Sequence, residues 1–248
     1  MTHKSHLRFQ LDIAQEKASY TTGRTQCPFC RREELTGIID AAGSMLLVEN
    51  KFQMLGDAYQ TVLIETDVCT EDISTYSPDY MRRLLTFGID HWLAMEATGR
   101  YASVVFFKNH GPLSGGTIPH AHFQIVGLEA IDYHSGISGA IFEGIEILRW
   151  GQNRITVSTH PNASATEINI IATPRDDAFM ADAIQKTVHY LLRRCSSYNL
   201  FFYHWEGAII CKAMPRYVVS PYLMGYSISH TSDQLVTVAQ ELRGLFGS

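Results

Sequence analysis

Hydrophobic and polar residues alternate along the first half of this chain in patterns that predict strands, one helix and two further strands. In residues 44–66, two apolar runs flank the turn-rich Leu55-Gly56-Asp57, which predicts two antiparallel strands. Residues 77–99 predict a helix, because Ser77 can cap it, Pro78 suits its first position and apolar residues follow at helical spacing. These apolar residues are Met81, Leu84, Leu85, Ile89, Trp92 and Leu93. Residues 102–107 then predict a strand, and a further strand follows from His120.

The second half of the chain repeats this order of elements with different residues. Its pattern predicts strands over residues 147–157 and 167–172, a helix over 177–194, and strands over 199–204 and 208–213. A terminal helix follows, with Ser232 as its cap and an apolar stripe. The stripe consists of Leu235, Val238, Ala239, Leu242 and Phe246. We therefore expect an α+β fold of two tandem halves, residues 1–135 and 136–248, each an antiparallel sheet with packed helices.

Composition narrows the class of protein and of partner. The 248 residues are 46% hydrophobic and 18% charged, which is ordinary for a globular protein, and the formal net charge is −5. No run of lysine or arginine favours nucleic acid or an anionic membrane as a partner. Neither a signal peptide nor a membrane-spanning apolar segment is visible, so the expected compartment is the cytoplasm. The five cysteines favour reduced thiols or metal ligands over disulfides.

The richest chemistry lies in residues 109–127, where a glycine-containing loop leads into the strand with His120, His122 and Gln124. Side chains two residues apart in a strand share a face, so these three groups are expected to lie together. A neutral imidazole can attack a phosphorus atom, and His122 is the expected nucleophile. An amide such as that of Gln124 forms hydrogen bonds but cannot shuttle a proton to water, which favours a transferable intermediate over its hydrolysis. Two histidines on a simply polar strand face are the alternative.

The segment resembles the histidine triad superfamily, and within it the branch of galactose-1-phosphate uridylyltransferase with its nucleotidyltransferase and phosphorylase relatives. The resemblance rests on Asn109-His110-Gly111, on Ser114-Gly115-Gly116 and on His120-Ala121-His122-Phe123-Gln124. It implies that His122 becomes nucleotidylated and that Gln124 holds the phosphoryl oxygens. It also implies that Asn109 and the residues Ser114, Gly115 and Gly116 bind phosphates, and that Asn50 and Lys51 lie against the nucleoside. The second half, with Cys211-Lys212-Ala213 in place of the histidine strand, is expected to be a degenerate copy without catalytic residues.

Cys27-Pro28-Phe29-Cys30 is a second motif that can bind zinc, although a structural site needs two further ligands. The resembling uridylyltransferases complete such a pair with a histidine after the second strand and with the first histidine of the signature. This chain has Cys69 at the former place, so the resemblance implies a structural zinc site of Cys27, Cys30, Cys69 and His120. A redox pair, buried free thiols and a site that has lost its metal are the alternatives.

The function expected from these motifs is a nucleotidyltransferase or phosphorylase acting on a nucleoside diphosphate sugar or a related nucleotide. A dinucleoside polyphosphate hydrolase or phosphorylase is the alternative enzyme, and a zinc-stabilised nucleotide-binding protein is the alternative without turnover. Arg216, in a rigid polar segment with two prolines, is a further candidate for a phosphate contact. The resemblance also implies a homodimer, because relatives are commonly dimers.

Overall fold

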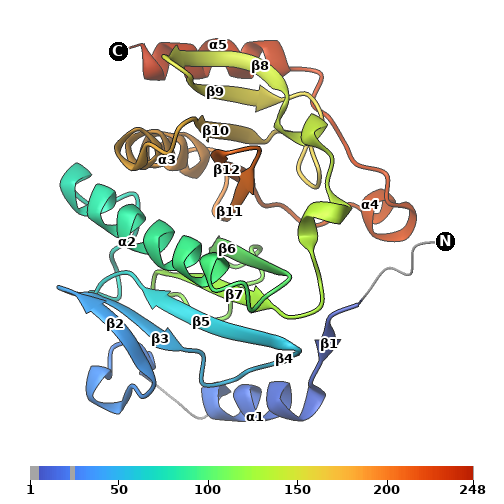
Figure 1. Cartoon of the computed structure of the whole chain (residues 1–248). Helices are drawn as coiled ribbons and strands as arrows, with labels where there is room; N and C mark the ends of the chain where they lie inside the picture. The colour runs from blue at the N-terminus through green and yellow to red at the C-terminus, as the bar shows by residue number, and fades with distance from the viewer. Residues whose placement is uncertain (1–5, 23–25, 248) are drawn as a thin grey trace. The chain divides into compact units, whose positions relative to one another are not determined.

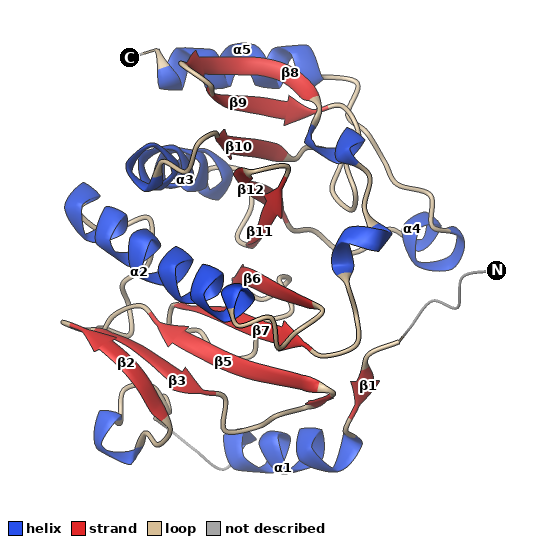
Figure 2. Ribbon diagram, in the orientation of Figure 1, coloured by secondary structure: helices blue, strands red, loops and turns tan. Residues whose placement is uncertain are grey.

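The computed structural model describes residues 6–22 and 26–247, which form two compact units (Figures 1 and 2). Within the described residues, the first unit comprises 6–72, 86–106 and 120–136, and the second comprises 73–85, 107–119 and 137–247. Two elements, α2 (Pro78–Ala97) and β6 (Ser103–His110), contribute residues to both units. No helix within the described residues is both long enough and apolar enough to cross a membrane.

The first unit is built on an antiparallel sheet with strand order β2-β3-β5-β7-β6. Its other strands are β2 (Ile38–Ala42), β3 (Met45–Glu49), β5 (Ala58–Ile64) and β7 (His122–Leu128). A small separate sheet pairs β1 (Arg8–Phe9) with β4 (Leu55–Gly56). The remaining elements are α1 (Leu11–Thr22) and two 3₁₀ helices, η1 (Arg32–Glu34) and η2 (Tyr133–Gly136).

The core of the first unit lies between its sheet and the C-terminal part of α2. The rings of Trp92 and Phe106 have centroids 5.8 Å apart, and those of Phe106 and Phe123 are 5.1 Å apart. A Cβ atom at Gly88 of α2 would lie 2.8 Å from the Phe106 ring, so only glycine permits this approach. Since Phe123 points toward α2, strand alternation places His122 and Gln124 on the opposite face of β7.

The second unit contains a sheet with strand order β11-β12-β10-β9-β8. Its strands are β8 (Gly144–Trp150), β9 (Asn153–Ser158), β10 (Ile168–Ala172), β11 (Tyr198–Trp205) and β12 (Ala208–Pro215). Its helices are η3 (Gly139–Phe142), α3 (Asp177–Leu192), α4 (Pro221–Tyr226) and α5 (Leu235–Phe246). When the strands of each sheet are numbered along the chain, their spatial order across the sheet is first, second, third, fifth, fourth in both units, as expected of tandem halves.

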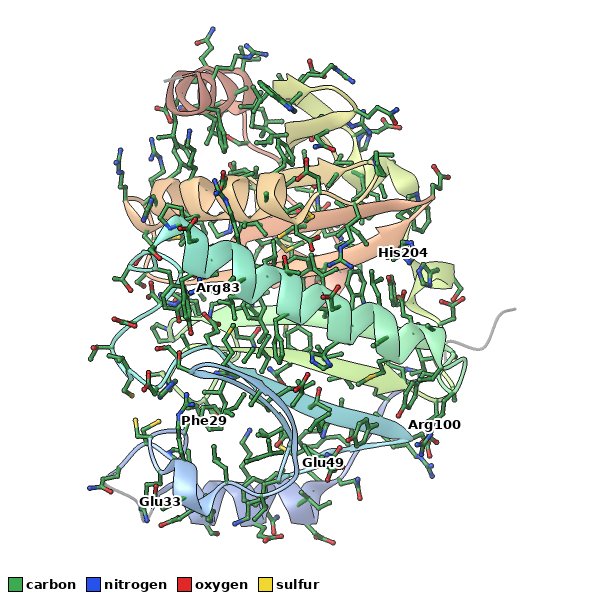
Figure 3. All side chains as sticks on the ribbon, turned by 60° about the vertical axis from the view of Figure 1, so that its left-hand side comes forward. Phe29, Glu33, Glu49, Arg83, Arg100 and His204 are labelled. Atoms are coloured by element: carbon green, nitrogen blue, oxygen red, sulfur yellow. The ribbon has the colours of Figure 1, made fainter. Side chains whose placement is uncertain are left out.

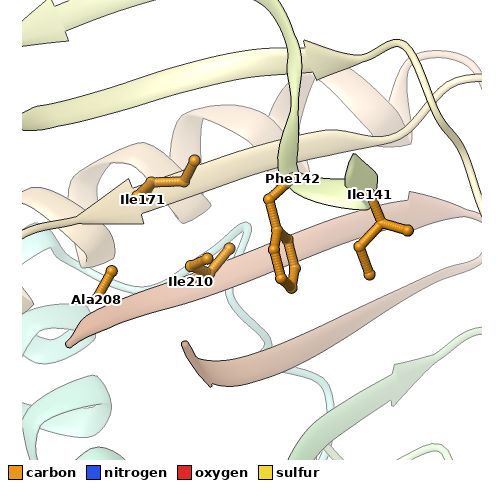
Figure 4. Packing of buried hydrophobic residues seen from close by; sticks show 5 residues of the cluster. All are labelled: Ile141, Phe142, Ile171, Ala208 and Ile210. Carbon is orange, nitrogen blue, oxygen red and sulfur yellow. The ribbon is translucent and has the colours of Figure 1, made fainter. Parts of the chain in front are cut away.

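One face of the second sheet is covered by α3, which contacts β10 and β12, and by α5, which contacts β8 and β9 (Figure 1). A separate apolar cluster on β10, β12 and η3 packs against partly buried Tyr203 and Trp205. The cluster consists of Ile141, Phe142, Ile171, Ala208 and Ile210 (Figure 4). Alternation along β12 puts Lys212 on the same face of the sheet as Ile210. The side chains that cover this part of the face therefore belong to the second unit itself.

Several local expectations differ from the structure. Residues 147–157 do not form one strand, because the chain reverses at Gly151, whose φ of +61° fits a tight turn between β8 and β9. Strand β2 was not expected, since its burial pattern is almost wholly exposed and gives no alternation. The Ser77 hydroxyl does accept a bond from the N–H of Tyr80, at 3.3 Å. Helix α5, however, begins at Leu235 after Gln234, and Ser232 lies outside it.

Candidate functional site

The four residues expected to bind zinc lie together in the first unit. Their ligand atoms are all within 4.8 Å of one another. Both Cys27 Sγ and Cys30 Sγ lie 3.5 Å from Nδ1 of His120. A tetrahedral zinc ion with Zn–S of about 2.3 Å and Zn–N of about 2.1 Å separates its ligands by roughly 3.6 Å, so these distances fit the metal. Cys69 reaches the group from the segment that follows β5.

Hydrogen bonding orients His120 as a metal ligand. Its Nε2 lies 2.8 Å from the carbonyl oxygen of Thr66, which can only accept, so Nε2 carries the proton. Nδ1 then presents its lone pair toward the sulfur atoms, as in histidines held by an outer carbonyl beside a metal. Partial burial, followed by the hydrogen bond with Cys30, raises the pKa of the Cys69 thiol to about 12. A dication among the sulfurs would reverse this effect by favouring thiolates.

His122, two residues further on, opens β7 with an imidazole of defined tautomer. Its Nδ1 lies 2.8 Å from the carbonyl oxygen of His120, which can only accept, so Nδ1 carries the proton and donates the hydrogen bond. The neutral ring then carries its lone pair on Nε2, which is the atom that would act as nucleophile. The side chain is 7% exposed, and Gln124 lies on the same face of β7, paired in register with Val62 of β5.

Phe29, which is labelled in Figure 3, lies in the middle of the Cys-x-x-Cys segment. It contacts both the metal ligand His120 and the candidate nucleophile His122. Its ring is edge-on to both imidazoles, with centroids 5.9 Å from His120 and 5.3 Å from His122. The side chain is 9% exposed, so it also shields the His122 ring from water. Phe29 was not predicted to belong to the site, although its position between two metal ligands in the sequence indicates it.

Asn50 and Lys51 follow β3 in the first unit. The Asn50 N–H donates to the carbonyl oxygen of Gln60 on β5, and Gln60 pairs in register with Val126 on β7. Val126 lies about 13 Å along β7 from His122, at 3.3 Å per residue. The Asn50 side chain accepts from the N–H of Phe52 at 3.1 Å. The Lys51 ammonium stands 4.1 Å from the centre of the Tyr20 ring of α1.

The other expected phosphate-binding residues, Asn109 and 114–116, belong to the second unit. The Ser114 hydroxyl donates to the carbonyl oxygen of Gly111 at 2.7 Å. The Asn199 side-chain NH₂ donates to Asn109 Oδ1 at 2.6 Å and to the Ser114 carbonyl at 3.0 Å.

Close packing and backbone conformation also constrain this loop. A Cβ on Gly116 would lie 3.1 Å from the Asn109 side chain, and Gly115 has a φ of +87°. The hydroxyl of Ser197 accepts from the N–H of Leu113 at 3.1 Å. The sequence does not predict the roles of Asn199 and Ser197, because no local pattern links them to a loop more than 80 residues earlier.

The second unit carries a buried ion pair on β12 where the first unit has histidine and glutamine on β7. Lys212 Nζ lies 2.9 Å from Glu167 Oε2, and both side chains are wholly buried. The ammonium also donates to the carbonyl of Ile141 at 2.7 Å and to Asn169 Oδ1 at 2.9 Å. All three donors of the ammonium group are therefore engaged inside the unit.

Both halves of the chain match models of one protein family. Residues 9–131 match the family model "Domain of unknown function (DUF4931) N-terminal domain", and residues 135–246 match the corresponding C-terminal domain. The crystal structure of a DUF4931 family protein from Bacillus cereus is 40% identical, with a TM-score of 0.78 over 85% of this chain and 100% of the other. The chain belongs to the DUF4931 family. No curated protein matches its sequence.

More distant solved structures share the fold of this DUF4931 protein. A structure of uridylyltransferase is 16% identical, with a TM-score of 0.71 over 90% of this chain and 92% of the other. An ADP-glucose phosphorylase from Arabidopsis thaliana with bound ADP-glucose is 15% identical, with a TM-score of 0.70 over 90% and 93%. The chain thus has the fold found in uridylyltransferase and ADP-glucose phosphorylase, as the sequence resemblance implied.

Proposed function

We propose that this DUF4931 protein is a nucleotidyltransferase or phosphorylase that acts on a nucleoside diphosphate sugar or a related nucleotide. The observation that carries the proposal is the tautomer of His122. Its Nδ1–H donates to the carbonyl oxygen of His120 at 2.8 Å, which fixes the tautomer with the nucleophilic lone pair on Nε2. The fold shared with a uridylyltransferase and an ADP-glucose phosphorylase supports this reading.

The reaction would proceed by double displacement. Nε2 of His122 attacks the α-phosphorus, a P–N bond forms, and the bond to the bridging oxygen breaks so that a sugar 1-phosphate leaves. The Nδ1 proton stays on the ring, where the His120 carbonyl oxygen stabilises the positive charge of the intermediate. An acceptor phosphate oxygen then attacks the same phosphorus, and the P–N bond breaks. Gln124 cannot activate water as a base, so the intermediate persists until such an acceptor arrives.

We propose that the remaining candidate residues bind the substrate. Asn109 and the residues Ser114, Gly115 and Gly116 would bind phosphate oxygens, and Asn50 and Lys51 would contact the nucleoside. Small residues and backbone N–H groups suit an anion, because they allow close approach without a charged side chain. We likewise propose residues 1–135 as the catalytic half.

Zinc would be held by Cys27, Cys30, Cys69 and His120, and four protein ligands make its role structural. When bound, the metal fixes the Cys-x-x-Cys segment to the start of β7. Phe29 is thereby kept against His122, and the imidazole that donates to the His120 carbonyl keeps its orientation.

Intact-mass spectrometry after incubation with UDP-glucose, ADP-glucose or diadenosine tetraphosphate tests the proposal. We expect an acid-labile adduct of one nucleoside monophosphate in the wild-type protein. His122→Ala should abolish this adduct, whereas His160→Ala, which removes an exposed histidine from a loop, should retain it. Nucleotide binding without adduct or product across the three substrates would refute the enzyme and leave a binding protein.

A further inference from the structure

A small cavity in the second unit is lined by two parts of the chain that are distant in sequence. Its volume is about 170 Å³. Its walls are formed by the loop at residues 163–165, by residues 215–220 from the last residue of β12 onward, by Leu223 of α4 and by His230. All of these residues belong to the second unit, so the cavity is complete without any part of the first.

The loop on one side of the cavity is held rigidly by buried Glu167. Its carboxylate accepts the backbone N–H groups of Asn162 at 3.0 Å, Ala163 at 2.8 Å and Ser164 at 3.0 Å. The backbone N–H groups of residues 162–164 are therefore used, and the charge of Glu167 is paired with Lys212 at 2.9 Å. What the loop offers to the cavity is the side chain of Ser164.

Two polar atoms at this cavity have no hydrogen-bond partner among the described residues: the hydroxyl of Ser164 and Nε of Arg216. Ser164 is only 8% exposed. Leaving buried polar atoms unpaired is costly, and native proteins do so rarely without a ligand or a functional reason. The Ser220 hydroxyl and His230 Nε2, 3.4 Å apart, add further polar groups to the wall.

The charges at the cavity favour an anion. Arg216 is a lining residue, and neither aspartate nor glutamate is among the described residues that line the cavity. Arg175 and Arg194 of the second unit each form an ion pair with a carboxylate, whereas no ion pair with a described carboxylate involves Arg216. A guanidinium offers several N–H donors in a planar fork that matches the oxygens of phosphate.

We propose that this cavity binds a phosphate group, with Arg216 and Ser164 as donors to its oxygens. The size supports a single phosphate, because 170 Å³ is several times the roughly 30 Å³ share of one water but below the roughly 300 Å³ of a typical drug-sized site. The bound species is inorganic phosphate or the phosphate end of a phosphorylated sugar. This site does not depend on nucleotidyl transfer at His122.

Isothermal titration of the full chain with inorganic phosphate, and separately with glucose 1-phosphate, tests the proposal and distinguishes the two sources. Arg216→Gln should weaken binding roughly ten- to a hundred-fold, since it removes a charge-assisted hydrogen bond. Arg193→Gln removes the same charge from an exposed position at the end of α3 and should leave the affinity unchanged. His122→Ala, titrated in parallel, should also retain phosphate binding, which separates this cavity from the proposed nucleotide site.

Ser164→Ala is a second test variant, and we expect it to fold as the wild type does. Replacing an unpaired buried hydroxyl is expected to leave the thermal unfolding midpoint unchanged or higher without phosphate, while the affinity for phosphate falls several-fold. Equal affinities in wild type, Arg216→Gln and Ser164→Ala would overturn the proposal. So would the absence of binding of both probes at millimolar concentration by the folded wild-type protein.

Discussion

Replacing Lys212 by methionine should destabilise the second unit more than any surface substitution. The pair with Glu167 spans 2.9 Å, and both side chains are wholly buried. Lys212→Met leaves the Glu167 carboxylate buried without its counter-ion, although its three backbone donors remain. Breaking one side of such a pair costs about 3–5 kcal/mol, and the bonds to Ile141 and Asn169 are lost as well.

The double variant Lys212→Met/Glu167→Gln isolates the charge effect. A neutral glutamine can still accept backbone N–H groups of the loop, and no uncompensated charge remains. We therefore expect the double variant to be more stable than Lys212→Met alone, by about 1–2 kcal/mol, which is a clear departure from additivity. Urea unfolding followed by the fluorescence of Trp150 and Trp205, both in the second unit, measures the difference. A loss below about 1 kcal/mol in Lys212→Met would refute the reasoning.

In the single variant Glu167→Gln, the free energy of unfolding should depend on pH, and the sign of this dependence can be predicted. Burial lowers the pKa of Lys212, while the charge and hydrogen bond of Glu167 raise it. Without Glu167 the folded-state pKa falls further below the unfolded value, and in that interval the unfolded chain binds one more proton. The free energy of unfolding should therefore rise with pH toward the ordinary lysine pKa of about 10.4, by at most about 1.4 kcal/mol per unit. A stability of this variant that falls over the same interval would contradict the assignment.

Three further predictions concern the first unit. Cys69→His should retain about one equivalent of zinc by elemental analysis, whereas Cys69→Ala should retain less than about half; equal metal in both would exclude Cys69 as a ligand. Gln124→His should shorten the lifetime of the nucleotidyl adduct in intact-mass time courses, because a third imidazole can pass a proton to or from water; an unchanged lifetime would count against the proposed role of the amide. Gly88→Ala should lower stability by about 1–3 kcal/mol in thermal or urea unfolding, since its Cβ would meet the Phe106 ring at 2.8 Å; a neutral effect would mean that the ring moves freely.

The sequence alone predicted the helices α2, α3 and α5 and most strands of the two larger sheets, but not α1, α4 or β2. Helix α2 follows from apolar spacing and from Ser77, which does accept the N–H of Tyr80. Such patterns are local, because helix and strand periods act over a few residues. The motif residues of β7 were equally visible, since His122 and Gln124 share a face in any strand.

Tertiary structure decided the features that depend on residues far apart in the chain. It brought Cys69 beside His120, oriented both imidazoles through backbone carbonyls and placed Phe29 against them. It also supplied Asn199 as the organiser of the Asn109 loop, 90 residues away. No period or spacing encodes these contacts, because they arise only when strand register and loop packing fix which distant groups meet. The sequence therefore determined which chemistry is available, and the fold decided which atoms can use it.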